Sequence, residues 1–130
     1  MIKKNLLVLL FVLLVFVISA CGSASNTPDA VIEAYLTALV SGDNAAAVNL
    51  SCAAWEENAN AEGASFEGVE VALEGMNCSV LSEDGANATV ACEGEIVFSY
   101  AGGEDELIPL SRRNYSLSFE AGEWRMCGYE

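Results

Sequence analysis

The chain contains no histidine, only two prolines and only five basic residues. Without histidine, it lacks the side chain that enzymes use most often as a general base and that metal sites use most often as a ligand. Against the five basic residues stand 19 acidic ones, so the formal net charge is −14. Because nucleic acid is bound by basic surfaces, this composition argues against a nucleic-acid partner.

Several recognisable sites are also missing. There is no CxxC pair, no glycine-rich phosphate loop and no calcium loop of the DxDxDG kind. The acidic run at residues 104–106 lacks the spacing of calcium ligands and is typical of a solvated charge run. We therefore expect no metal and no cofactor.

What the chain does have at its N-terminus is the tripartite pattern of a secretory signal. Two lysines at positions 3 and 4 precede an apolar run over residues 6–18, and small residues follow at Ser19 and Ala20. The uncharged stretch is shorter than the about 20 residues that a membrane-spanning helix needs. A signal peptide over residues 1–20 is the better interpretation.

The residues that end this signal, Ile18-Ser19-Ala20-Cys21, resemble the lipobox of bacterial lipoproteins. The resemblance implies that Cys21 receives a diacylglycerol and that the chain is cut before it, which would anchor the protein on the extracytoplasmic face of a bacterial membrane, in the cell envelope. A plain signal peptide with a chance cysteine is the alternative. Residues 21–27 then form a short tether of flexible composition, and residues 28–130 form one domain.

Four further cysteines, Cys52, Cys78, Cys92 and Cys127, are an even number in an exported chain and predict two disulfides, for which three connectivities exist. Zinc is disfavoured by the spacing and by the absence of histidine. If residues 84–86 form a three-residue hairpin loop, Cys78 faces Cys92, and Cys52 pairs with Cys127 by elimination. A loop that differed by one residue would spoil this pairing.

The front of the domain is predicted to be helical. Thr27 is placed as an N-cap, Pro28 at the first helical position and Gly42 just past the last turn of a helix with a wide apolar stripe. A second helix is expected over residues 44–59, with a kink near Ser51.

The back of the domain is predicted to be a sheet, because the apolar pattern changes to a period of two. It runs through residues 69–80, 86–100, 107–119 and 124–126, with a bulge near Gly75. Four strands joined by short turns predict an antiparallel meander that packs against the helices. The fold class is therefore α+β.

Three stretches resemble the nuclear transport factor 2-like family: residues 28–50, residues 86–100 and residues 116–128. The family has a cone-shaped fold in which a curved sheet and its helices enclose a pocket. The side chains that this resemblance places as candidate pocket-lining groups are aromatic: Tyr35, Trp55, Phe98, Tyr100, Tyr115 and Trp124.

Some members of that family, such as ketosteroid isomerases and small dehydratases, carry out acid/base chemistry in the pocket. In this chain Glu93 and Glu95 alternate with Cys92 and Ile96, so we expect both carboxylates to point away and no acid to face inward. A non-catalytic module that binds a small apolar ligand or a protein partner is favoured. An enzyme of the isomerase kind and a structural envelope protein remain the alternatives, and a homodimer through the sheet is compatible with each.

Overall fold

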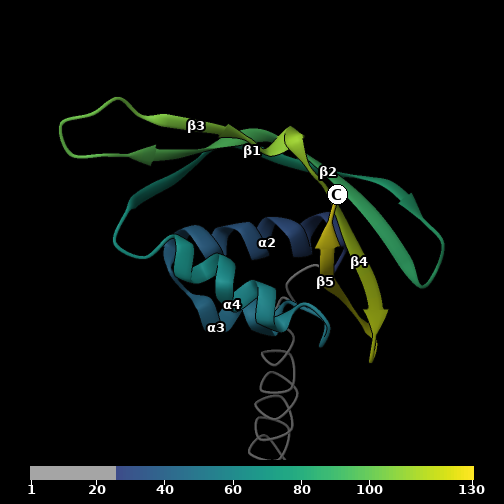
Figure 1. Cartoon of the computed structure of the whole chain (residues 1–130). Helices are drawn as coiled ribbons and strands as arrows, with labels where there is room; N and C mark the ends of the chain where they lie inside the picture. Colours follow the sequence, from purple (N-terminus) through teal and green to yellow (C-terminus); the bar gives the residue numbers. More distant parts are fainter. Residues whose placement is uncertain (1–25) are drawn as a thin grey trace, which may run out of the picture.

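A computed structural model describes residues 26–130; the predicted signal peptide and Cys21 lie outside the described residues. Helices precede strands, and the helices gather beneath one face of a curved sheet (Figure 1). The elements in chain order are α2 (Pro28–Ser41), α3 (Asn44–Asn49), α4 (Glu56–Ser65), β1 (Glu70–Glu83), β2 (Asn87–Ser99), β3 (Glu106–Pro109), the 3-10 turn η1 (Leu110–Arg112), β4 (Asn114–Glu120) and β5 (Glu123–Tyr129). The α+β class is confirmed.

The sheet has five antiparallel strands, in the order β1-β2-β4-β5 with β3 paired to β2. The expected strand over residues 107–119 is two strands, because η1 interrupts it. β4 pairs with residues 87–91 of β2 and β3 pairs with residues 95–98, so both lie along the same edge of that long strand. The expectation of four strands is therefore wrong by one.

The helix α2 has the predicted limits. Pro28 stands at its first turn, and Gly42 ends it in the left-handed conformation, with φ of 76°. The amide of Gly42 donates to the carbonyl of Leu39, and the amide of Asp43 donates to that of Ala38. These bonds satisfy carbonyl groups that the last turn leaves without helical partners.

The second predicted helix is wrong as a single element. Residues 50–55 interrupt it, leaving α3 before the break and α4 after it, and α4 continues to Ser65, beyond the expected end. The break lies where the kink was placed: Ser51 forms an isolated parallel bridge with Met126 of β5. The Cys52 amide donates to the Met126 carbonyl at 2.8 Å, which carries the chain alongside β5.

A bulge in the β1–β2 pair lies near Gly75, as predicted. Glu74 is opposite Glu95, whereas Asn77 is opposite Glu93, so β1 gains one residue between them. Gly75 and Gly94 both have positive φ there, at 62° and 97°. Because bulges bend the strand that carries them, this one contributes to the curvature of the sheet over the helices.

Both predicted disulfides are present. Cys78 is the direct partner of Cys92 across β1 and β2, with their Cα atoms 4.0 Å apart. The register arises differently from the expected loop. Next to the turn, the amide of Asp84 donates to the carbonyl of Asn87, which leaves two linking residues, and an irregularity at residues 80–82 restores the register that brings the cysteines together.

The core lies between the sheet and α2. Ile32, Tyr35 and Leu36 of α2 are buried against Val90 and Leu117 of the sheet. Within residues 26–130, no helix combines the length and the apolar character that crossing a membrane requires.

Candidate functional site

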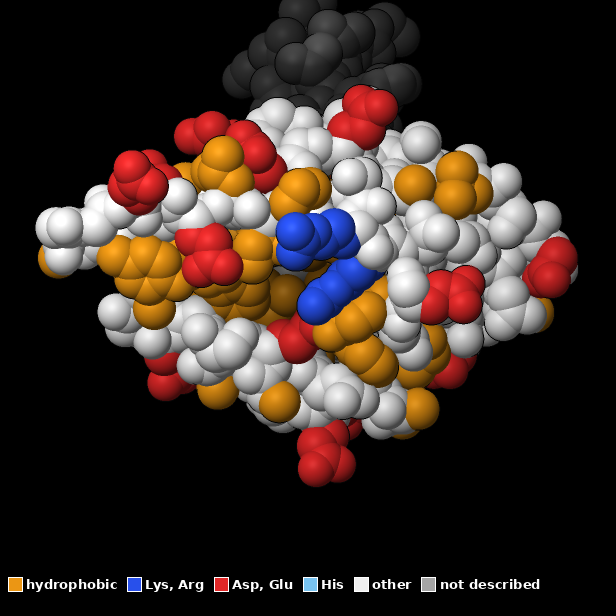
Figure 2. All heavy atoms as spheres, turned by 45° about the horizontal axis from the view of Figure 1, so that its top comes forward, with side chains coloured by type: hydrophobic (Ala, Val, Ile, Leu, Met, Phe, Trp, Pro, Cys, Tyr) orange, Lys and Arg blue, Asp and Glu red, His pale blue; other side chains and the backbone are white. Residues whose placement is uncertain are grey.

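A cavity of about 540 Å³ lies between α2, α4 and the concave face of the sheet. This volume is within the range of about 300–1,000 Å³ that small-molecule sites occupy. Its apolar lining includes Leu36, Leu39, Phe66, Ile96, Phe98, Ile108 and Leu110. Figure 2 shows the hollow from outside, with apolar side chains at its floor and basic side chains at its edge.

The polar part of the cavity centres on Glu62 of α4. The hydroxyl of Tyr35 donates to Oε2 of Glu62 at 2.6 Å. The guanidinium of Arg113 lies 3.6 Å from the other carboxylate oxygen, and the side chain of Glu62 is only 18% exposed. A short bond from a buried phenol and a nearby cation therefore hold one carboxylate in the wall of the cavity.

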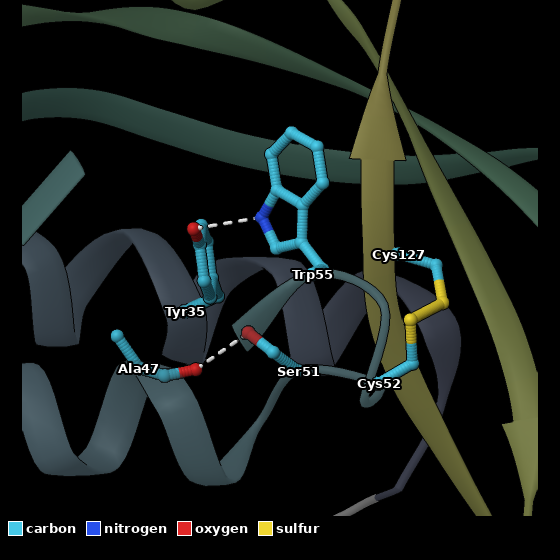
Figure 3. The surroundings of a disulfide bond; sticks show 6 residues. All are labelled: Tyr35, Ala47, Ser51, Cys52, Trp55 and Cys127. Atoms are coloured by element: carbon cyan, nitrogen blue, oxygen red, sulfur yellow. Dashed lines mark hydrogen bonds between the residues drawn. A yellow bond between two sulfur atoms is a disulfide. The ribbon is translucent and has the colours of Figure 1, made fainter. Parts of the chain in front are cut away.

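Trp55 orients the Tyr35 hydroxyl of this cluster. Its Nε1–H donates to the Tyr35 hydroxyl at 3.1 Å (Figure 3). Tyr35 therefore accepts one hydrogen bond and donates another, which sets the orientation of its hydroxyl toward Glu62. The tryptophan is itself placed by the segment that breaks the predicted second helix, because the Trp55 amide donates to the carbonyl of Cys52.

Tyr129, from the end of β5, completes the aromatic part of the site. The guanidinium of Arg113 stacks over its ring, 3.9 Å from the centroid. The same ring meets Trp55 and Tyr115 edge-on, with centroids 5.2 Å and 6.3 Å away. Arg113 is thus held by a carboxylate on one side and a π face on another, although its side chain remains half-exposed.

The tyrosines of this site are weaker acids than free tyrosine. Burial, with the hydrogen bond to Glu62, raises the pKa of Tyr35 well above its usual range. Burial raises the pKa of Tyr115 to about 12. Burial and the nearby Glu62 carboxylate also raise the pKa of Tyr129. At neutral pH these phenols are protonated and able to donate hydrogen bonds.

Of the six candidate pocket residues, the structure brings Tyr35, Phe98 and Tyr115 to the cavity wall. Trp55 lies one layer behind, bonded to Tyr35.

Tyr100 and Trp124 lie elsewhere, which corrects the sequence-based expectation. Tyr100 is 47% exposed, and its hydroxyl donates to Glu106. Its strand ends at Ser99, so the inward alternation of β2 does not extend to it. Trp124 is buried at the far end of β5, where its ring packs edge-on against Phe119.

The expectation that no acid faces inward was also wrong. Glu93 is exposed and Glu95 is half-buried, and neither lines the cavity; the inward carboxylate comes from a helix and not from a strand. The sequence holds a signal for it: Trp55, Ala59 and Glu62 are spaced by four and three residues, so they share one face once α4 continues past residue 59. Ending the helix too early hid Glu62.

The second disulfide lies behind the polar cluster, near Trp55. Cys52 and Cys127 have their Cα atoms 5.4 Å apart, and the bridge ties the segment that carries Trp55 to β5 (Figure 3). Within residues 26–130, the single grouping of potential metal ligands is Cys52, Cys127 and Glu120. Its two sulfur atoms are joined in the disulfide, so it offers no thiolate to an ion.

No protein-family model matches the sequence, and no curated protein does. A solved structure of similar fold is the solution structure of a SEC-C motif containing protein from Rhodopseudomonas palustris. The TM-score is 0.56 at 18% sequence identity, over 83% of this chain and 80% of that chain. At this identity the likeness shows the fold alone.

Proposed function

We propose that this protein is a lipoprotein that holds a small ligand-binding domain at the outer surface of a bacterial membrane. The cavity beneath the sheet is the single observation that carries the binding part of this proposal. It combines an apolar lining with one converging polar cluster, Tyr35, Glu62 and Arg113. Ligand sites typically have this composition, in which apolar walls supply affinity and a few polar groups set orientation.

The anchoring part of the proposal depends on Cys21, which lies outside the described residues. Its support is the lipobox resemblance together with two disulfides in the domain, since disulfides persist in oxidising compartments. The amide of Trp124 donates to the side chain of Asn26, so the start of the described chain is fastened to β5. The five residue-to-residue steps from Cys21 to Asn26 span at most about 18 Å, which would keep the domain near the bilayer.

The finer fold assignment, a nuclear transport factor 2-like cone, belongs to the same proposal. The order of helices and strands, the curved sheet and the enclosed cavity support it. The cavity also disfavours a purely structural envelope protein, for which side chains would be expected to fill this space.

Binding can be tested with a mouth-blocking variant and a matched control on the same helix. Ala61 and Ala64 are both exposed on α4, but only Ala61 lines the cavity. The full chain, reconstituted in phospholipid nanodiscs, would be probed by saturation-transfer NMR with the uncharged amide 4-phenylbutanamide, and empty nanodiscs would give the background. We expect transfer to the wild type and to Ala64→Trp, and its loss in Ala61→Trp. Equal transfer to both variants would contradict a ligand site in this cavity.

Anchoring can be tested separately in cells. Cys21→Ala should release the protein from the membrane fraction and remove the lipid mass from the processed chain. A Cys21→Ala protein that stayed membrane-bound would contradict the lipoprotein assignment.

An acid/base enzyme is the second candidate, and Glu62 is the observation that favours it. A carboxylate within hydrogen-bonding distance of a tyrosine, in a cavity with apolar walls, is the pairing that proton transfer next to a carbonyl requires. Glu62 would remove the proton and a phenol would stabilise the developing oxyanion. If β,γ-unsaturated ketones were isomerised, the conjugated product would absorb in the ultraviolet, and Glu62→Gln would abolish the signal. If none of these ketones were isomerised, the enzyme candidate would be rejected and the binding function would stand unaffected.

A further inference from the structure

The basic residues of the domain are distributed unevenly. Residues 26–130 contain three arginines and no lysine or histidine against all 19 acids, which is a net charge of −16. Two of the three cations, Arg112 and Arg113, line the one cavity described above. The third, Arg125, lies on β5, where it pairs with Glu123 and donates to a backbone carbonyl of α3.

The two cavity arginines differ in what they already contact. Arg113 pairs with Glu62 at 3.6 Å, which is longer than the about 2.7–2.9 Å of a strong charged hydrogen bond. Its guanidinium is positioned by this pair and by the Tyr129 ring, yet half of its side chain remains exposed. The side chain of Arg112 makes no hydrogen bond or ion pair with any residue in the described part of the chain, and the residue is exposed.

Each guanidinium has five N–H donors in a planar fork that matches a carboxylate. The contacts of Arg113 use only part of this capacity, and Arg112 retains all of it. Figure 2 shows basic side chains together at the edge of the hollow, directly beside its apolar floor. Because the rest of the domain surface is acidic and repels anions, the edge of the hollow that carries Arg112 and Arg113 is the place where an anion would be attracted.

The volume of the cavity limits the size of the part of a ligand that it can bury. Taking about 30 Å³ for each water-sized group, 540 Å³ holds on the order of 18 such groups. The lining beyond the arginines is aliphatic and aromatic, with Leu39, Phe66 and Phe98 among its members. Burial of an apolar body against these side chains would supply most of the affinity.

We infer that the ligand is a small amphiphile with an apolar body and a terminal carboxylate, in which the body enters the cavity and the carboxylate binds Arg112 and Arg113 at its mouth. This inference rests on the proposed function, since it assumes that the cavity binds a ligand. It adds the chemical class and the orientation: the acid end faces the solvent and the apolar end lies beneath the sheet.

Three probes of the same shape test the charge of the ligand: 4-phenylbutyrate, the uncharged 4-phenylbutanamide and the cationic 4-phenylbutylamine. Their dissociation constants would be measured by equilibrium dialysis against the full chain in nanodiscs, with empty nanodiscs to correct for partitioning into lipid. Arg112→Gln combined with Arg113→Gln removes both cations from the mouth. Arg125→Gln is the matched control, because it removes one arginine that does not line the cavity.

We expect the carboxylate to bind the wild type about tenfold more tightly than the amide, since hydrogen bonds to a charged group contribute at least this factor. In the double variant the carboxylate and the amide should bind about equally tightly, whereas Arg125→Gln should keep the wild-type preference for the carboxylate. Salt should weaken binding of the carboxylate more than that of the amide.

The outcomes separate this inference from the function on which it rests. Equal binding of carboxylate and amide to the wild type would overturn the inference and leave the cavity site intact. Tightest binding of the amine would overturn it too, and would assign the polar end to Glu62. Binding of none of the three probes would overturn both the inference and the proposed binding function.

Discussion

Replacing Gly94 with alanine tests whether the bulge that bends the sheet depends on a close approach of two backbones. A Cβ atom built on Gly94 would lie 2.5 Å from the carbonyl oxygen of Glu74 and 2.6 Å from the carbonyl carbon of Gly75. Both atoms belong to the backbone of β1, so no side-chain rotation can relieve the overlap. Gly94 also has φ of 97°, which L-residues with a side chain rarely adopt.

Gly85 provides the matched control. It has φ of 83°, but a Cβ there would meet nothing within 4 Å. Alanine at either position incurs the backbone strain, roughly 1–2 kcal/mol. Only Gly94→Ala adds the overlap, and forcing atoms into a packed site costs a further 1–3 kcal/mol or so. We therefore expect Gly94→Ala to lower the free energy of unfolding by about 3 kcal/mol or more, and Gly85→Ala by about half as much.

The assay is equilibrium unfolding of the full chain in urea, followed by the fluorescence of its two tryptophans. The transition midpoint should shift further for Gly94→Ala than for Gly85→Ala, with the slope unchanged. Equal shifts for the two variants would refute the close approach of β1 and β2 at the bulge.

Three further predictions concern the turn, the disulfides and the tyrosines. Ala121 has φ of 51° and precedes Gly122, with φ of 81°, in the β4–β5 turn. Because asparagine tolerates a positive φ better than alanine does and a β-branched residue tolerates it worse, Ala121→Asn should raise the free energy of unfolding by about 0.5–1 kcal/mol and Ala121→Val should lower it. The opposite order of stability in urea unfolding would contradict the turn geometry. Removing the Cys52–Cys127 bridge, with its sequence separation of 75, should lower the free energy of unfolding by about 4 kcal/mol, and removing the Cys78–Cys92 bridge, with a separation of 14, by about 3 kcal/mol, because closing a longer loop constrains the unfolded chain more. Chemical denaturation of the two paired Cys→Ser variants measures both losses, and a larger loss for the Cys78–Cys92 pair would contradict this explanation. The pKa values of Tyr35, Tyr115 and Tyr129 are raised in the folded protein, to about 12 for Tyr115, so as the pH rises the unfolded chain releases its phenolic protons before the folded protein does. The stability that these protonated phenols contribute is fully present below about pH 10 and should be lost as the pH rises toward 12 and beyond. Unfolding would be measured at stepped alkaline pH, with tyrosinate absorbance as the second signal, and a constant stability above pH 10 would contradict the prediction.

The parts of the fold that the sequence predicted are those with a local cause. Pro28 and Gly42 mark the limits of α2 because one fits only the first helical turn and the other favours the left-handed conformation. The bulge at Gly75 followed from a slip in a period of two. The pairing of Cys78 with Cys92 was correct, although two irregularities of register, and not a symmetrical loop, produce it.

The parts that escaped prediction depend on contacts distant in the sequence. The break between α3 and α4 exists because residues 50–52 exchange hydrogen bonds with Met126 of β5, and nothing local to the helix pattern reveals that partner. The division of the third strand at η1 depends on which half of β2 each piece pairs with.

The same reason explains why half of the site was missed. Tyr35, Phe98 and Tyr115 were predicted because aromatic residues at inward positions stand out in a sequence. Glu62 and Arg113 did not stand out, since a carboxylate in an acidic chain and an arginine beside another resemble ordinary surface residues. They form a cluster only because the fold brings α4, the junction of η1 with β4 that carries Arg113, and the end of β5 together.

The most direct test of the central claim, that the cavity holds a small molecule, is native mass spectrometry of the full chain released gently from the cells that make it. The account predicts a stoichiometric small molecule retained on the wild type and on Ala64→Trp, and absent from Ala61→Trp. Wild-type protein that carries no such adduct, or an adduct that survives unchanged in Ala61→Trp, would contradict it.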